Sequence, residues 1–88
     1  MSWGYEIDAR ALKELKKLGQ PKRERVLRYL DEHILGKEDP RRFGKALRHD
    51  FAGLWCYRVG DVRVVCEIKE EEVIVLVIRV GFRRDVYD

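Results

Sequence analysis

The sequence predicts an α+β domain: an N-terminal strand, a two-helix hairpin, and then an antiparallel sheet of about three to four strands. Apolar residues recur at helical spacing after the first strand, and Gly and Pro mark the helix ends. The second half is rich in Val, Ile, Tyr and Trp, with turn-forming residues between the apolar runs. With 45% hydrophobic and 40% charged residues, the 88-residue chain is typical of a single globular domain over residues 1–88.

The chain is expected to open with a short strand and a first helix. Residues 3–7, "WGYEI", alternate weakly between apolar and polar, which favours a strand. Asp8 is a good N-cap for a helix that Gly19 ends. The expected apolar stripe of this helix consists of Leu12, Leu15 and Leu18.

A second helix follows at once, because Pro21 suits a first helical turn and Gly36 suits an end. The apolar residues expected on one side of it are Val26, Leu27, Leu30 and Ile34. Its other sides are mostly Lys and Arg, which indicates a solvated surface or, alternatively, a basic face that touches RNA or an acidic partner.

A basic loop is expected over residues 37–45, where an Asp-Pro pair and a Gly interrupt the pattern, and "KALRH" after it is a candidate short strand. The candidate RNA-contacting or ribosome-contacting residues in and beside this loop are Arg41, Arg42, Lys45 and Arg48. Such charges form a rim that contacts phosphates, or they serve only to solvate the loop.

Residues 53–68, "GLWCYRVGDVRVVCEI", predict a hairpin that closes through a two-residue turn at Gly60-Asp61. The face expected under the helices carries Trp55, Tyr57, Val59, Val62, Val64, Cys66 and Ile68. The opposite face carries Leu54, Cys56, Arg58, Arg63, Val65 and Glu67. A slip of one residue would bury the arginines, so the register is well specified.

This register places Arg58 directly opposite Arg63 on the second face. Opposed like charges destabilise a sheet, so an anion such as a carboxylate or a phosphate is expected between them. The alternative is that Asp61, Glu67 or another acidic side chain of the chain itself neutralises the pair.

The last strand and the C-terminus add to the same region. In a simple register, Ile74, Leu76 and Ile78 share the arginine face, and an apolar face of this kind predicts a covering partner. The segment after this strand supplies Arg83, Arg84 and Tyr87. These residues bring cations and a phenol to the site, or form an ordinary basic tail.

Several classes of function are disfavoured. Cys56 and Cys66 lie on opposite faces of the predicted hairpin, which disfavours a disulfide, and two thiols alone make no zinc site. His33 and His49 are expected to be structural or solvated. No phosphate-binding glycine loop is present, and no metal or cofactor is expected. Without a long apolar stretch or a signal-like start, the protein is expected to be cytoplasmic, with reduced thiols and no contact with a membrane.

Arginines with a tyrosine suit one reaction in particular, the cleavage of RNA by attack of a 2′-OH on the neighbouring phosphate. That reaction requires cations for the charge that builds up on phosphorus, a base for the 2′-OH and an acid for the leaving oxygen. Because tyrosine titrates near pH 10 and arginine above pH 12, the surroundings or the substrate's scaffold must assist strongly.

Four motifs, "IDARALKELKKL", "DPRRFGKALR", "GLWCYRVGDVR" and "VIRVGFRRDVY", resemble the RelE/ParE toxin superfamily over essentially the whole chain. The resemblance is greatest to the RelE branch, whose members cut mRNA in the ribosomal A site and are neutralised by an antitoxin. It implies a RelE-like fold, endoribonuclease activity on ribosome-bound mRNA, and a RelB-like antitoxin partner, with a toxin–antitoxin heterotetramer as one assembly.

The resemblance also implies roles for particular residues. Arg58 and Arg63 correspond to residues that bind the phosphate and stabilise the transition state, and Arg83 has a similar role. Tyr87 corresponds to a tyrosine that stacks on the base or helps proton transfer. Arg84 is grouped with the residues of the basic loop as a contact to RNA or ribosome.

Two departures from the family pattern bear on activity. Cys56 stands where relatives usually carry Lys or Arg, and Phe82 stands where they usually carry His or another basic residue. Both are expected to remove a charge or a proton-transfer group from the site that holds Arg58 and Arg63. Two alternatives to a ribosome-dependent endonuclease therefore stay open: a weakened or inactive relative that still binds an antitoxin, and a ParE-like inhibitor of DNA gyrase that acts by binding.

Overall fold

The structure is a computed structural model, and it describes residues 2–82. The strands are β1 (Gly4–Ile7), β2 (Lys45–Ala46), β3 (Trp55–Val59), β4 (Val62–Lys69) and β5 (Ile74–Phe82), and the helices are α1 (Ala9–Lys17) and α2 (Gln20–His33). Short 3-10 turns span Pro40–Arg42, His49–Phe51 and Glu70–Glu72. The predicted α+β order, with a strand and two helices before four further strands, is confirmed.

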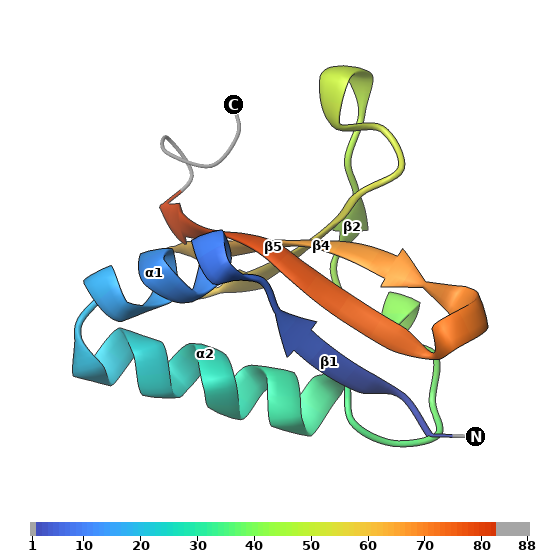
Figure 1. Ribbon diagram of the computed structural model, residues 1–88, viewed down its shortest axis with the longest axis horizontal. Helices are drawn as coiled ribbons and strands as arrows, with labels where there is room; N and C mark the ends of the chain where they lie inside the picture. The colour runs from blue at the N-terminus through green and yellow to red at the C-terminus, as the bar shows by residue number, and fades with distance from the viewer. Residues whose placement is uncertain (1, 83–88) are drawn as a thin grey trace.

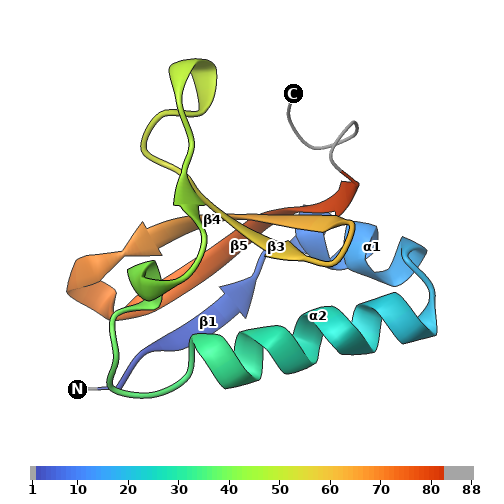
Figure 2. The ribbon, with the colours of Figure 1, turned by 180° about the vertical axis from the view of Figure 1, so that it is seen from behind.

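The described strands form a single sheet in the order β1-β5-β4-β3-β2. β1 lies parallel to β5, and the other neighbours are antiparallel. The parallel pair needs a long crossover, and the two helices begin that crossover. Both helices lie on the same face of the sheet, as the two opposite views show (Figures 1 and 2).

Helix α1 begins where the sequence predicts, because the Asp8 carboxylate accepts a hydrogen bond from the Ala11 N–H at 2.8 Å. Its buried residues are Ala11 and Leu15. The prediction was wrong at Leu12, whose side chain is 40% exposed. The inward stripe follows the i, i+4 spacing of Ala11 and Leu15, and the small Ala11 side chain fits against the sheet.

Helix α2 begins one residue before Pro21, and Val26, Leu30 and Ile34 pack into the core as predicted. Leu27 is only partly buried at the edge of this cluster. The Tyr5 hydroxyl donates to the Asp31 carboxylate at 2.7 Å, which fastens β1 to the helix.

The predicted hairpin register is confirmed at every pair from Val59–Val62 through Arg58–Arg63 to Trp55–Cys66. The helix-side residues Tyr57, Val64 and Cys66 have no exposed surface. Between β4 and β5 the register shifts, because Val65 pairs with Arg79 while its neighbour Cys66 pairs with Val77. Ile78 is therefore an extra residue in β5, as in a β-bulge.

The second face of the sheet is not open along its whole length. Cys56 and Val65 are buried there in a small cluster, against which Leu47, Leu54 and Ile78 pack. Leu47 and Leu54 belong to the connection between β2 and β3, which projects from the sheet away from the helices (Figure 2). Ile74 and Leu76 remain partly exposed further along β5.

None of the helices in residues 2–82 is long and apolar enough to cross a membrane.

Candidate functional site

Arg58 and Arg63 face each other across β3 and β4, as the hairpin register requires. Arg58 is exposed, whereas only 7% of the Arg63 surface is accessible, and one Arg63 guanidinium nitrogen lies 3.5 Å from the Gly60 carbonyl oxygen. Among residues 2–82, no carboxylate lies within ion-pair distance of either guanidinium. Within this range, two cations of one sheet face therefore share no neutralising partner.

Asp61 does not neutralise the arginines, although it sits in the turn between them. The Lys22 ammonium on α2 holds its carboxylate, with Nζ–O distances of 2.7 and 2.8 Å. This hydrogen bond lowers the pKa of Asp61, with further help from the charge of Lys22. Glu67, the other candidate, is exposed on β4 and forms no ion pair with a described residue.

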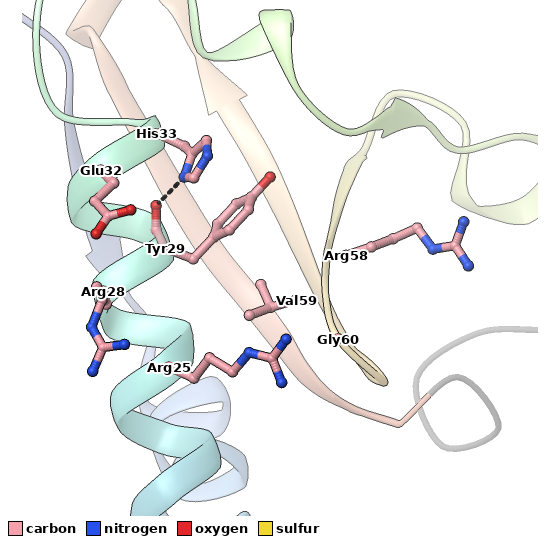
Figure 3. A pocket seen from close by; sticks show the side chains of 8 residues that line it. All are labelled: Arg25, Arg28, Tyr29, Glu32, His33, Arg58, Val59 and Gly60. Atoms are coloured by element: carbon pink, nitrogen blue, oxygen red, sulfur yellow. Dashed lines mark hydrogen bonds between the residues drawn. The ribbon is translucent and has the colours of Figure 1, made fainter.

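The arginine pair lies on the opposite side of the sheet from a hollow of about 300 Å³ between α2 and the end of β3. The residues that line this hollow are Arg25, Arg28, Tyr29, Glu32, His33, Arg58, Val59 and Gly60. Figure 3 shows the side chain of Arg58 pointing away from α2, while Arg25 and Tyr29 stay on the helix side. The guanidinium group of Arg58 is therefore directed away from the helix side of the hollow.

Lys45 on β2 pairs directly with Cys56 on β3, so the two residues share the face that carries the arginine pair. The preceding residue, Gly44, has φ +80°, and a Cβ there would lie 2.5 Å from the Cys56 carbonyl oxygen. Only glycine permits β2 to approach β3 this closely. In the sequence Gly44 signals no more than a loop, so this role emerges only from the structure.

The other predicted RNA-contacting residues of the basic loop differ in their surroundings. Arg41 is held by Glu70 at 2.9 Å and by Asp39 at 3.5 Å, and Arg42 pairs with Glu38. Lys45 and Arg48 are exposed and form no ion pair within the described part of the chain. Arg83, Arg84 and Tyr87 lie outside the described residues.

The two departures from the family pattern lie in different places. Cys56 is on the arginine face, but it is only 2% exposed and is covered by the small apolar cluster. Phe82 pairs with Val62 and lies on the helix side, where the Lys22 ammonium is 5.1 Å from its ring centroid. The expectation that Phe82 removes a group from the arginine face was therefore wrong, because the bulge and the strand alternation turn it to the other side.

The tyrosines of the described chain are poorly suited to take up a proton near neutral pH. Burial, followed by the hydrogen bond to Asp31, raises the pKa of Tyr5 to about 12. Burial also raises the pKa of Tyr29 and of Tyr57, whose hydroxyl donates to the Pro40 carbonyl at 2.7 Å. His33 is packed between the rings of Tyr29 and Phe43, with Nδ1 3.0 Å from the Tyr29 carbonyl oxygen.

Chemically, the arrangement is suited to bind an anion and to stabilise negative charge that builds up on it. Within residues 2–82, no group of three or more His, Cys, Asp or Glu side chains is gathered where it could hold a metal ion.

Known proteins are similar to this chain in both sequence and fold. A family described as "ParE toxin of type II toxin-antitoxin system, parDE" matches residues 5–87. Toxin RelG of Mycobacterium tuberculosis (strain ATCC 25618 / H37Rv) is 35% identical over 65 residues, which cover 72% of this chain and 75% of RelG.

Solved structures agree with this assignment. One chain in the crystal structure of the toxin–antitoxin complex RelBE2 from Mycobacterium tuberculosis has a TM-score of 0.79 at 26% identity, covering 94% of this chain and 100% of that chain. The isolated E. coli RelE toxin has a TM-score of 0.73 at 33% identity, covering 91% of this chain and 83% of that chain. Because the family match spans nearly the whole chain, the protein belongs to the RelE/ParE superfamily of toxins from type II toxin–antitoxin systems.

Proposed function

We propose that this toxin is a ribosome-dependent endoribonuclease that cuts mRNA in the ribosomal A site and so stops translation. The observation that carries the proposal is the cross-strand pair Arg58–Arg63, which has no carboxylate partner among residues 2–82. A scissile phosphate between two guanidinium groups would relieve their repulsion and supply the acceptors that their N–H groups require.

In the proposed reaction, the 2′-oxygen attacks the adjacent phosphorus, and the bond from phosphorus to the 5′-oxygen of the next nucleotide breaks. The 2′-OH loses a proton and the leaving 5′-oxygen gains one, so the products are a 2′,3′-cyclic phosphate and a 5′-OH end. Arg58 and Arg63 stabilise the charge on the non-bridging oxygens. By resemblance to the family, Arg83 adds a further cation, and Tyr87 stacks on the base or assists proton transfer.

The remaining candidates are proposed to contact RNA or the ribosome around this site. Lys45 on β2 and Arg48, which follows this strand, are both exposed. Arg41 and Arg42 would have to exchange their present carboxylate partners for phosphates. Arg84 is included on the family resemblance alone.

An antitoxin is the second proposed partner, RelB-like and encoded beside the toxin, in a complex such as a heterotetramer in the cytoplasm. Support comes from structural relatives solved as toxin–antitoxin complexes, including the intact E. coli RelBE complex at 28% identity and a TM-score of 0.70. The partly exposed Ile74 and Leu76 offer apolar surface for such a partner.

Controlled expression with mapping of mRNA ends tests the proposed activity. We expect translation to stop and new 5′ ends to appear within codons of translated mRNA. Purified toxin should cut mRNA on programmed ribosomes and leave the same RNA intact when it is naked. Arrested ribosomes that carry intact mRNA would contradict the proposal.

A ParE-like inhibitor of DNA gyrase is a second candidate, favoured by the description of the matching family, which names ParE. If the purified toxin prevented gyrase from supercoiling DNA and left mRNA on ribosomes intact, this candidate would be supported.

A weakened relative that only binds an antitoxin is favoured by Cys56, which leaves that position without the usual cation. If the wild-type toxin stops growth at low expression, this third alternative fails.

A further inference from the structure

We propose that Lys45 supplies the third cation of the arginine site, in place of the basic side chain that is absent at Cys56. The inference rests on the proposed function and assigns Lys45 to the phosphate-binding face of the sheet rather than to the outer rim of the basic loop.

The sheet register places Lys45 beside the arginine pair. Lys45 is the direct cross-strand partner of Cys56, and Arg58 lies two residues further along β3 on the same face. Direct partners have Cβ atoms about 4.5–5.5 Å apart and diagonal neighbours about 7–8 Å, distances that long side chains span. Lys45, Arg58 and Arg63 therefore place one cation on each of three neighbouring strands.

The position of Lys45 is built into the fold rather than left to a free loop. On one side, the Trp55 indole N–H donates to the Phe43 carbonyl at 2.7 Å. On the other side, the Leu47 N–H donates to the Leu54 carbonyl at 2.9 Å. Between these anchors, Gly44 brings the backbone of β2 against Cys56, as described above.

The charge of Lys45 is not neutralised by a residue of the described part of the chain. Lys45 is exposed, and no described carboxylate pairs with it, whereas Arg41 and Arg42 are each held by acidic residues. The Cys56 side chain packs beneath the apolar cluster of Leu47 and Leu54, so a long cationic side chain in its place would displace that cluster. Lys45, on the neighbouring strand β2, can supply the positive charge without displacing this apolar cluster.

The ligand that this arrangement fits is the ribose-phosphate backbone of RNA, with the phosphate next to the scissile one against Lys45. An ammonium group acts there as a point charge, while the two guanidinium groups hold the scissile phosphate. We therefore expect Lys45 to increase the affinity for RNA by the amount that one phosphate contact contributes.

Titration of the toxin with a trinucleotide RNA tests this inference, with a 2′-deoxy substitution at the attacking position so that no cleavage occurs. Amide shifts in the NMR spectrum report both the site and the affinity. Lys45→Ala should weaken binding about fivefold or more and reduce the slope of log K against log salt by about 0.7, as expected for one lost contact to a single strand. Lys45→Arg should restore most of the affinity.

Lys13→Ala is the matched control, because it removes one exposed lysine from α1, on the far side of the sheet. It should change affinity less than twofold. The inference is overturned if Lys45→Ala and Lys13→Ala behave alike, or if the RNA shifts no amide of β2. Binding is read without cleavage, so a toxin that binds through Lys45 but cuts no ribosomal mRNA would contradict the proposed function and leave this inference supported.

Discussion

Arg58 and Arg63 are direct cross-strand partners, yet Asp61, in the turn that joins their strands, is bound to Lys22 on the opposite side of the sheet. The nearest acidic residue in the sequence therefore does not relieve the repulsion between the two arginines. Opposed like charges reduce the stability of a sheet, and an anionic ligand between the two guanidinium groups, as proposed, would relieve their repulsion.

Replacing Arg63 with Met is expected to stabilise the free toxin. The variant keeps a long side chain at a buried position and removes one of two opposed charges, so the free energy of unfolding should rise by roughly 0.2–1 kcal/mol. Urea unfolding at low salt measures the change, and added salt should diminish it. Arg28→Met removes a charge from α2 as the control and should have little effect. A loss of stability at Arg63 larger than about 1 kcal/mol would show that this arginine has a structural role.

Gly44→Ala should destabilise the protein more than Gly53→Ala. Both glycines have positive φ angles, +80° and +94°, so either substitution carries a backbone penalty of about 1–2 kcal/mol. At Gly53 a new Cβ meets no atom within 4 Å, but at Gly44 it would overlap the Cys56 carbonyl and the Trp55 indole. The overlap adds roughly 1–3 kcal/mol, and equal losses in chemical denaturation would argue against the close approach of β2.

Tyr57→Phe removes the hydroxyl that donates to the carbonyl of the buried Pro40. Because the carbonyl then lacks its partner, the free energy of unfolding should fall by about 1–3 kcal/mol. Tyr29→Phe is the comparison, since no described residue accepts a hydrogen bond from the Tyr29 hydroxyl, and it should cost less than about 0.5 kcal/mol. If both variants lose the same stability, the Tyr57 contact does not anchor the basic loop to the sheet.

Neither cysteine should react readily with a thiol reagent in the native protein. Cys56 and Cys66 are buried on opposite faces, and burial raises the pKa of the Cys66 thiol well above its usual range. In the native protein, the rate at which each thiol is labelled should be limited by unfolding. In urea, where the chain is unfolded, both thiols should react at once. Reaction of Cys56 within seconds under native conditions would show an exposed, activated thiol on the arginine face.

The hairpin of β3 and β4 could be predicted from the sequence, because a two-residue turn and strict alternation leave only one register that keeps Arg58 and Arg63 out of the core. The helix boundaries followed from Asp8 and Pro21, whose preferences are local. The stripe of α1 was misjudged at Leu12, because hydrophobicity alone does not reveal that the small Ala11 is the residue that fits against the sheet.

Long-range contacts explain the rest of the differences. The parallel pairing of β1 with β5, the bulge at Ile78 and the packing of Ile78 against the cluster of Cys56 and Val65 join segments that are separated in sequence, so local patterns do not specify them. For the same reason, the sequence does not reveal that Phe82 lies on the helix side of the sheet. The location of Lys45 opposite Cys56 depends on a strand of only two residues, too short to carry a periodic signal.

Single-turnover cleavage of A-site mRNA on purified programmed ribosomes tests the central role of the Arg58–Arg63 pair most directly. The wild-type toxin should cut, and Arg58→Ala and Arg63→Ala should each slow the cleavage step by about a hundredfold or more, as expected for the loss of a group that stabilises the transition state. Arg28→Ala should cut at the wild-type rate. Cleavage by the two variants at that same rate would contradict a phosphate site between Arg58 and Arg63.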